Sequence, residues 1–288
     1  MTRILYNPFS GNGEGKVRAE EVKKFYEGKE TEFVDMTSVD YGEFFGGLPE
    51  GDDICICGGD GTLNRFVNDT ENIEKKCDIY YFATGTGSDF WHELGRTPGE
   101  APIKVNEYLA DLPIVEIAGK RMRVLNGVGY GIDGYCCEVA DGIREKDPGT
   151  KINYAGIAIK GLLFHFKPVR ATVTVDGEEH VIEKAWIAPT MNGKCYGGGM
   201  MPTPAQDRLD PERKLTVMLM HGKGRIGTLM IFPKIFKGEH VKHTEMCKTL
   251  TGHEITVKFD RPTALQIDGE TVRGVTEYSV TSKAPIHV

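Results

Sequence analysis

The sequence lacks two features that would assign it to whole classes of protein: an apolar run of membrane-spanning length and a positive net charge. A membrane helix needs about 20 consecutive apolar residues, so we expect no transmembrane segment. The formal net charge of −7 argues against the broad basic surface of a nucleic-acid-binding protein. No signal peptide is recognisable before the first expected strand, and a cytoplasmic protein is therefore expected.

The cysteines also lack a familiar arrangement. Seven are present, an odd number, and none shows C-x-x-C spacing. This pattern indicates reduced, buried thiols and a cytosolic compartment. Internal repeats and low-complexity tracts are missing as well. A chain of 288 residues with ordinary globular composition predicts a sizeable core and two domains.

Two common nucleotide-binding patterns are absent. The glycine-rich segment Asn7-Pro8-Phe9-Ser10-Gly11-Asn12-Gly13-Glu14-Gly15-Lys16 follows an expected strand at 3–6 and precedes an expected helix at 16–26. It is not a Walker A loop, because the glycine spacing is one residue short and Val17 stands where Ser or Thr would hold magnesium. It is not G-x-G-x-x-G either. Asn7, Ser10 and the loop amides can still donate to phosphate oxygens. A flexible strand–helix loop is the equal alternative.

What the chain does have is a buried strand, 53–57, that runs into Gly58-Gly59-Asp60-Gly61-Thr62-Leu63-Asn64. Glycines allow positive φ and close approach of a ligand, and Thr62 can cap the following helix. A strand, a glycine turn and a helix N-terminus together bind phosphate through backbone amides and the helix dipole. Asp60 fits such a site if a cation lies between it and the phosphate, or if it orients the turn. A tight structural turn is the alternative.

A third glycine-rich loop, 83–90, follows an expected strand at 78–82 and contains Thr86 and Asp89. Further strand and helix signals at 31–36 and 41–48 complete an alternation that predicts a parallel sheet. Ligands bind outside the carboxyl ends of such strands. The three loops are therefore expected to meet at one edge of the sheet and to form a nucleotide or phosphate site.

Beyond residue 120 the pattern becomes rich in β-strands. Strands at 112–117 and 121–126 are expected to pair around Gly119, and helices are expected at 135–145 and 154–166. The Asp176-Gly177 dipeptide predicts a hairpin between 171–175 and 179–183. Five more strands are expected, at 185–190, 215–220, 255–259, 264–267 and 276–280. We therefore expect an α/β domain at 1–120 and a β-rich domain at 121–288.

Several of these segments resemble the diacylglycerol kinase catalytic family, which includes soluble bacterial lipid kinases and, more distantly, sphingosine and ceramide kinases. The resemblance rests on the segments 7–11, 58–64 and 85–90 and extends through 126–133, Asn192, 197–199 and 268–270. Gly-Gly-Asp-Gly alone is shared with NAD kinases and 6-phosphofructokinases, whereas Gly-Thr-x-x-Asp-Phe separates the lipid kinases from both. Arg65, Ser88 and Trp91-His92 depart from the family pattern and leave the acceptor lipid open.

The resemblance implies a Rossmann-like three-layer α/β nucleotide-binding domain, a β-sandwich-like domain, and an active site in the cleft between them. It implies ATP and Mg²⁺ as cofactors. The residues that it assigns to the nucleotide site are Asn7, Pro8, Phe9, Ser10, Gly11, Thr37, Gly58, Gly59, Asp60, Gly61, Thr62, Leu63, Asn64, Thr86 and Asp89.

Phosphoryl transfer to an alcohol also needs a cation and a group that accepts the hydroxyl proton. Asp60 and Asp89 could orient Mg²⁺. The resemblance favours Glu270 as the base, with Asp268 as the next choice. Asp-Gly-Glu occurs a second time at 176–178, where it predicts only a hairpin, and a simple turn is the alternative for residues 268–270 too.

The segment 207–212 offers Asp207, Asp210 and Glu212 as oxygen ligands for a magnesium ion. An ordinary solvated turn is the equal alternative. We expect ATP and a diacylglycerol-like lipid as substrates, the lipid being met transiently at the membrane surface. A kinase for a sphingoid base or for NAD, or a nucleotide-binding regulator without catalysis, are the other hypotheses. The sequence does not determine the oligomeric state, and a homodimer is one possibility.

Overall fold

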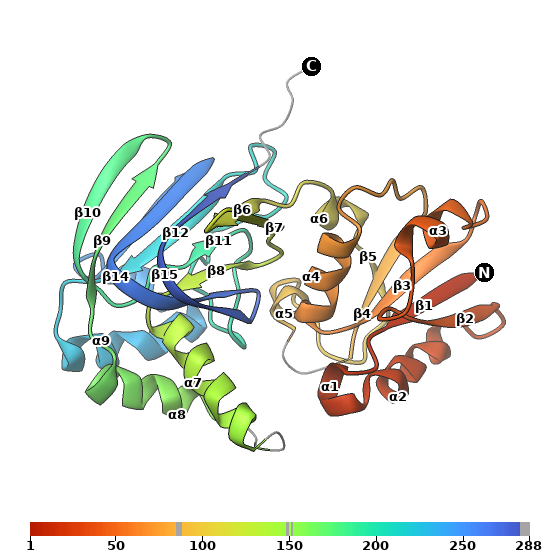
Figure 1. Ribbon diagram of the computed structural model, residues 1–288, viewed down its shortest axis with the longest axis horizontal. Helices are drawn as coiled ribbons and strands as arrows, with labels where there is room; N and C mark the ends of the chain where they lie inside the picture. Colours follow the sequence, from red (N-terminus) through yellow and green to blue (C-terminus); the bar gives the residue numbers. More distant parts are fainter. Residues whose placement is uncertain (85–87, 148–149, 151, 283–288) are drawn as a thin grey trace. The chain divides into compact units, whose positions relative to one another are not determined.

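The computed structural model describes residues 1–84, 88–147, 150 and 152–282. They divide into two compact units, Met1–Asp111 and Leu112–Val288, and each is described here by itself (Figure 1). The expected boundary at residue 120 falls inside the second unit. The reason is that β6 (Ile114–Ile117) and β7 (Lys120–Arg123) form a hairpin, and β6 also pairs with a strand near the C-terminus.

The first unit is built on a five-stranded sheet with strand order β2-β1-β3-β4-β5. The first four strands are parallel, whereas β5 runs antiparallel to β4. This confirms the expected α/β class. The strands are β1 (Thr2–Tyr6), β2 (Thr31–Asp35), β3 (Asp53–Gly58), β4 (Ile79–Ala83) and β5 (Ile103–Lys104).

Helices cover both faces of this sheet (Figure 1). On one face Ala19 and Val22 pack into a core with Ile4 and Cys55. On the other face Tyr41 contacts Phe66 edge-on, with ring centroids 5.8 Å apart. The helical segments are α1 (Ser10–Gly13), α2 (Gly15–Glu20), the 3₁₀ segment η1 (Glu21–Phe25), α3 (Tyr41–Gly46), α4 (Asp60–Asp69), α5 (Asp89–Glu93) and α6 (Asn106–Ala110).

The helix expected at 16–26 begins earlier and ends as a 3₁₀ helix. Part of the expected loop, from Ser10 onward, is already helical because both the amide and the hydroxyl of Ser10 donate to the Asn7 carbonyl, at 3.1 and 2.8 Å. The short elements β5 and α6 were not expected. They add to the β4 edge, where the Asn106 side chain accepts from the Ile79 amide at 2.8 Å.

The second unit is a ten-stranded antiparallel sheet in which the strands follow the order β13-β12-β11-β8-β14-β15-β6-β7, with β9 pairing β14 and β10 pairing β9. It is separate from the parallel sheet, as expected. The remaining strands are β8 (Gly127–Tyr130), β9 (Val169–Val175), β10 (Glu178–Ala185), β11 (Thr190–Met191), β12 (Leu215–Met220), β13 (Cys247–Gly252), β14 (Glu254–Ile267) and β15 (Glu270–Thr281).

Two expectations about these strands were wrong. The strands expected at 255–259 and 264–267 are one strand, β14, whose pairing is irregular between Lys258 and Thr263. Pro262 lies in that irregular stretch and has no amide hydrogen to give to a ladder. The strand expected at 185–190 is broken, because β10 ends at Ala185 and only Ile187 forms an isolated bridge before β11 begins.

Helical segments cover part of this sheet. They are α7 (Ile132–Lys146), α8 (Tyr154–Lys160), the π-helical turn η2 (Gly161–His165), α9 (Arg225–Ile231), and the 3₁₀ segments η3 (Phe232–Lys237) and η4 (Glu239–Lys242). Their inner faces pack against Trp186, Ile187, Met218 and Met220. The seven cysteines are free thiols, as expected; Cys77 and Cys137 are half-buried and the other five are buried.

Candidate active site

The parallel strands of the first unit end level with one another. Tyr6 is paired in register with both Asp35 and Cys57, and Cys57 is paired with Phe82. The loops that follow these strands therefore begin at one edge of the sheet, as the sequence predicts. Because β1 lies between β2 and β3, the strand order reverses at β1, and a crevice at such a point is where open α/β sheets bind ligands.

The loop after β1 is held by its own polar groups. The Asn7 side chain accepts from the Phe9 amide at 3.0 Å, and the Asn7 carbonyl accepts from Ser10. Phe9 itself is exposed. Gly15 is required here, since a Cβ at this position would lie 1.9 Å from the Asn7 carbonyl oxygen. These contacts fix the loop, although they use the Ser10 hydroxyl that the sequence offered as a phosphate donor.

The glycines of the turn after β3 differ in what the fold demands of them. A Cβ on Gly58 would lie 2.4 Å from Thr62, so Gly58 is required for packing. A Cβ on Gly59 or on Gly61 would meet nothing within 4 Å, and neither residue has positive φ. Gly59 caps α4 and Gly61 lies in its first turn. The space above these two glycines lies at the positive end of the α4 dipole.

Asp60 turns away from that space and into the protein. Its carboxylate is buried and accepts from the Ser88 hydroxyl at 2.7 Å and from the amides of Asp89 and Phe90 at 2.6 and 3.3 Å. Asp60 thus orients the turn and binds it to the N-terminus of α5. Of the two roles that the sequence left open, the contacts match the orienting role.

Tyr81 extends this buried network. Its hydroxyl lies 3.1 Å from both the Gly58 carbonyl oxygen and the Ser88 hydroxyl. Burial, followed by the nearby Asp60 carboxylate, raises the pKa of Tyr81 well above its usual value, so the phenol stays neutral. The carboxylate of Asp89 is also buried, at the start of α5. Thr86 lies outside the described residues.

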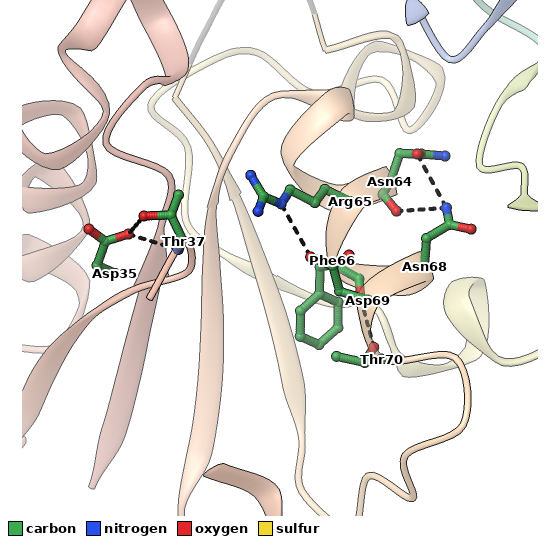
Figure 2. Close-up of polar contacts among 8 residues, drawn as sticks. All are labelled: Asp35, Thr37, Asn64, Arg65, Phe66, Asn68, Asp69 and Thr70. Carbon is green, nitrogen blue, oxygen red and sulfur yellow. Dashed lines mark hydrogen bonds and ion pairs between the residues drawn. The ribbon is translucent and has the colours of Figure 1, made fainter. Parts of the chain in front are cut away.

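Figure 2 shows how two more of the residues expected at the nucleotide site, Thr37 and Asn64, are held. The amide and the hydroxyl of Thr37 both donate to the Asp35 carboxylate, at 2.8 and 2.7 Å. The Asn64 side chain accepts from Asn68, one turn further along α4. Thr62 and Leu63 are buried, so their side chains belong to the core. Of the segment 58–64, the backbone at Gly59 and Gly61 is therefore the part that a ligand can approach most closely.

In the second unit, Asp268 is the first residue of the two-residue turn between β14 and β15, and Glu270 follows the turn. The Asp268 carboxylate accepts from the amides of Leu125, Asn126 and Gly127, at 2.6, 2.8 and 3.1 Å. Glu270 begins β15 and its side chain is exposed. Asp268 thus anchors the segment that leads into β8, whereas Glu270 stands at the surface.

The carboxylates of Asp207, Asp210 and Glu212 make contacts within their own turn. Asp207 and Asp210 each accept the amide two residues further on, at 3.0 and 2.8 Å, and Glu212 pairs with Lys214. Within the described ranges, no group of three or more His, Cys, Asp or Glu side chains is arranged to hold a metal ion. The alternative of an ordinary turn matches these contacts.

Sequence reasoning missed the role of Arg208 in the same turn. Its buried guanidinium donates to the Leu125 carbonyl at 3.2 Å and to the Asn126 side chain at 3.0 Å. Asn192 donates to the same Leu125 carbonyl at 2.8 Å. Asp268, Arg208 and Asn192 therefore converge on residues 125–127. The available signal in the sequence was an arginine among three acidic residues, but only the acidic residues were interpreted as functional.

Asp133 was also missed as a separate feature. Both its carboxylate oxygens are buried, beside the side chain of Tyr196. A Cβ on Gly129 would lie 1.8 Å from this carboxylate, so glycine is required there. Burial raises the pKa of Asp133 to about 6. The same burial, together with Asp133, raises the pKa of the neighbouring Tyr196 well above its usual value.

Comparison with protein families accounts for nearly the whole chain. The diacylglycerol kinase catalytic domain matches residues 1–116, and the YegS C-terminal NAD kinase beta sandwich-like domain matches residues 126–283. Together the two matches leave only residues 117–125 and 284–288 uncovered. The chain belongs to the diacylglycerol kinase catalytic family. The segments that carry the resemblance, among them 58–64, 126–133 and 268–270, lie within these two matches.

Individual members of this family are distant relatives. A diacylglycerol kinase of Mycobacterium tuberculosis (strain CDC 1551 / Oshkosh) is 26% identical over 206 residues, which are 69% of this chain and 64% of the relative. The match thus spans less than two thirds of that protein. A Staphylococcus epidermidis protein named provisionally as a lipid kinase is 28% identical over 76% of this chain and 70% of its own length.

Solved structures agree with the fold. A diacylglycerol kinase from Bacillus anthracis str. Sterne aligns over 97% of this chain and 93% of its own, with a TM-score of 0.60 and 16% identity. Another structure from that strain aligns over 98% of this chain and 92% of its own, with a TM-score of 0.69 and 18% identity. At such identities the likeness establishes the two-domain fold of the family and nothing finer.

Proposed function

We propose that this kinase-family protein transfers the γ-phosphoryl group of ATP to the hydroxyl of a diacylglycerol-like lipid, which gives a phosphatidate-like product. The acceptor hydroxyl oxygen forms a bond to the γ-phosphorus, and the bond from that phosphorus to the β–γ bridging oxygen breaks. ADP leaves, and the hydroxyl proton passes to a carboxylate. Membership of a family that includes a named diacylglycerol kinase supports this assignment.

The observation that carries the nucleotide half of the proposal is the open space above Gly59 and Gly61. Gly61 lies in the first turn of α4, where glycine costs up to about 1 kcal/mol relative to alanine. At neither Gly59 nor Gly61 would a Cβ meet another atom of the protein within 4 Å. Close approach of a phosphate to the backbone explains both glycines. The loop that contains Asn7 and Ser10 begins at the same sheet edge and would supply further amides.

For the proton acceptor we propose Glu270. A base must have a lone pair free to take the proton within hydrogen-bonding reach of the acceptor hydroxyl. Both carboxylate oxygens of Asp268 already accept backbone amides, whereas the side chain of Glu270 is exposed. Asp268 is then a positioning residue that holds the segment 125–127.

Magnesium, when bound to the nucleotide, would neutralise charge on the phosphates. Three of the carboxylates that the sequence offered for it are already engaged by donors of the protein. Asp60 accepts hydrogen bonds on both oxygens, and Asp207 and Asp210 cap their own turn. We therefore expect the metal to enter with the nucleotide phosphates and assign no step to a protein-bound ion.

The test is incubation with γ-labelled ATP and a panel of detergent-dispersed alcohols: diacylglycerol, ceramide, a sphingoid base and NAD. We expect the label in phosphatidate. NAD belongs in the panel because the second family match is described as NAD kinase-like. If the label appeared only in NADP, the acceptor would be NAD and not a lipid. ATP binding without transfer to any acceptor would indicate a non-catalytic regulator.

A further inference from the structure

The helices on the second unit leave large apolar side chains in solvent. Phe164, Ile226 and Met230 are 71%, 74% and 70% exposed, and Ile159 and Phe236 are each 45% exposed. These five side chains come from α8, η2, α9 and η3, and we call them the apolar cluster. Isolated exposed apolar residues are common, but a concentration of them on adjoining elements marks an interaction surface.

The four elements lie together on one face of the sheet. Their inner sides, which include Ala158, Leu162, Ile231 and Ile235, belong to one core with the sheet. The π-helical turn, in which the Phe166 amide donates to the Gly161 carbonyl at 2.8 Å, buries Phe166 and leaves Phe164 outside. Arg225, at the start of α9, donates to the Leu162 carbonyl of η2 at 2.6 Å. Figure 1 shows α8 and α9 on the same side of this sheet.

Along α9, Ile226 and Met230 are four residues apart and so share one face of the helix. The next residue, Ile231, packs into the core. Helices whose inner sides rest on a common sheet have outer sides that point away from it. The apolar cluster therefore lies on the outer surface of this helical layer.

The same segments are positively charged, unlike the chain as a whole. Residues 154–167 and 221–242 together contain seven Lys or Arg residues and one acidic residue, Glu239. Their net charge is +6, so the rest of a chain with net charge −7 carries −13. Five of the seven are exposed lysines: Lys160, Lys167, Lys223, Lys237 and Lys242.

Acidic side chains on the neighbouring helix α7 do not cancel this charge. Glu138 and Glu145 both pair with Arg273, at 3.7 and 3.5 Å, and Asp141 pairs with Arg144 at 3.1 Å. The positive charge of the helical layer is therefore available to an external partner.

We infer that the outer face of α8, η2, α9 and η3 docks onto the surface of an anionic lipid bilayer. Apolar side chains that enter the headgroup region, flanked by lysines that stay at the phosphates, are what interfacial binding requires. A second copy of the chain would bring this positive surface against itself in a two-fold dimer. The use of the surface to reach a lipid acceptor rests on the proposed function, but binding can be measured without catalysis.

The first test is sedimentation of the full chain with vesicles, without nucleotide or diacylglycerol. We expect binding to vesicles of equal parts phosphatidylcholine and phosphatidylglycerol, weakened by salt, and little binding to phosphatidylcholine alone. No binding of the wild-type protein to the anionic vesicles would overturn the inference, while kinase activity measured separately on dispersed lipid would leave the proposed function intact.

Variants then locate the surface. Replacing Lys160, Lys223 and Lys237 by Gln should weaken binding about a hundredfold, at roughly fivefold for each lysine. Ile226→Ser with Met230→Ser should weaken it at least tenfold, since about 0.8 kcal/mol is lost for each buried CH₂. Matched controls are Val181→Ser, an exposed apolar residue on β10, and Lys258→Gln, an exposed lysine on β14. Both should bind like the wild type.

Equal losses in the control variants would show that the helical layer has no special role. A wild-type dimer that becomes monomeric on Ile226→Ser with Met230→Ser would make the surface a contact between copies, which also overturns the inference. Circular dichroism identifies variants that fail to fold. Activity toward dispersed diacylglycerol should stay within about twofold in the folded variants, because none of these side chains has been placed near the proposed chemistry.

Discussion

Asp176 and Asp268 adopt the same conformation in two different hairpins. Their φ angles are +49° and +47°, each is followed by a glycine with positive φ, and each carboxylate accepts backbone amides from a distant segment. Asp176 anchors residues 253–254, and Asp268 anchors residues 125–127. Two-residue hairpin turns of this kind need positive φ at both positions, which Asp-Gly supplies. The tripeptide Asp-Gly-Glu thus occurs twice in the same backbone conformation, and residues 176–178 can serve as a control for residues 268–270.

Glu270→Gln should lower kcat about 10²- to 10⁴-fold with ATP affinity largely kept, since the change removes the proposed base and preserves its shape. Glu178→Gln should leave kcat within about twofold, because an exposed residue of β10 makes no transition-state contact. Steady-state kinetics with diacylglycerol would measure both. If Asp268→Asn were inactive while Glu270→Gln remained active, the base would be Asp268 and not Glu270.

Asp268→Asn is expected to act on the fold. One oxygen that accepts amides becomes an amide donor, so the free energy of unfolding should fall by about 1–3 kcal/mol. Denaturant titration would measure it, with Asp176→Asn as the structural match. A catalytic loss in Asp268→Asn without any loss of stability would contradict the anchoring role.

Gly61→Ala and Gly58→Ala should separate binding from packing. Gly61→Ala fills open space at the start of α4, so stability should hold or rise by up to about 1 kcal/mol, while ATP affinity should fall at least about tenfold. Gly58→Ala overlaps Thr62 and should cost about 1–3 kcal/mol of stability. Calorimetric ATP titration and thermal unfolding would measure both. Unchanged ATP affinity in Gly61→Ala would remove the main support for the phosphate site.

Asp60→Asn should lower both the stability of the protein and its kcat. It sets an amide group against the hydroxyl of Ser88 and the amides of Asp89 and Phe90, which should destabilise the turn by about 1–3 kcal/mol. Misplacement of the turn should lower kcat on the order of 10²-fold in the protein that still folds. Ser88→Ala keeps the carboxylate and should have a smaller effect on both quantities. Near-normal turnover in a folded Asp60→Asn would exclude the orienting role.

Asp133 should make stability depend on pH. Its pKa is raised from 3.8 to about 6 in the folded protein, so the native state binds the extra proton between these values. Stability should therefore fall as pH rises from about 4 to 6 and stay lower above that, by on the order of 3 kcal/mol. Asp133→Asn should flatten this profile and be more stable than the wild type at pH 8. Parallel pH profiles for the two proteins would contradict the prediction.

Local patterns in the sequence predicted the parallel sheet, the edge of that sheet at which the glycine-rich loops begin, and both Asp-Gly hairpins. Each depends on neighbours in the chain: alternation of strands and helices, or turn residues at fixed positions. The sequence did not predict that two expected strands form the single strand β14. Pairing with β15 continues past the irregular stretch that contains Pro262.

The roles of acidic residues were harder to predict. From the sequence, Asp60, Asp207 and Asp268 were interpreted as metal ligands or bases. A sequence shows which residues carry a charge, but it does not show which hydrogen-bond donors contact them in the folded protein. The amide partners of Asp268 lie more than 140 residues away along the chain, and Ser88 lies 28 residues from Asp60. For Asp60 and Asp268, only the folded backbone brings these donors to the carboxylates.

The bond between Ser88 and Asp60 also has a consequence for when the proposed phosphate site forms. Asp60 sits at the start of α4, but its partners follow β4, so the glycine turn is fixed only after β4 has joined β3. A chain that has folded no further than α4 has the glycines but not the contacts that orient them. The site is thus expected to form only after β4 has paired, and truncated chains ending before residue 90 should not hold nucleotide.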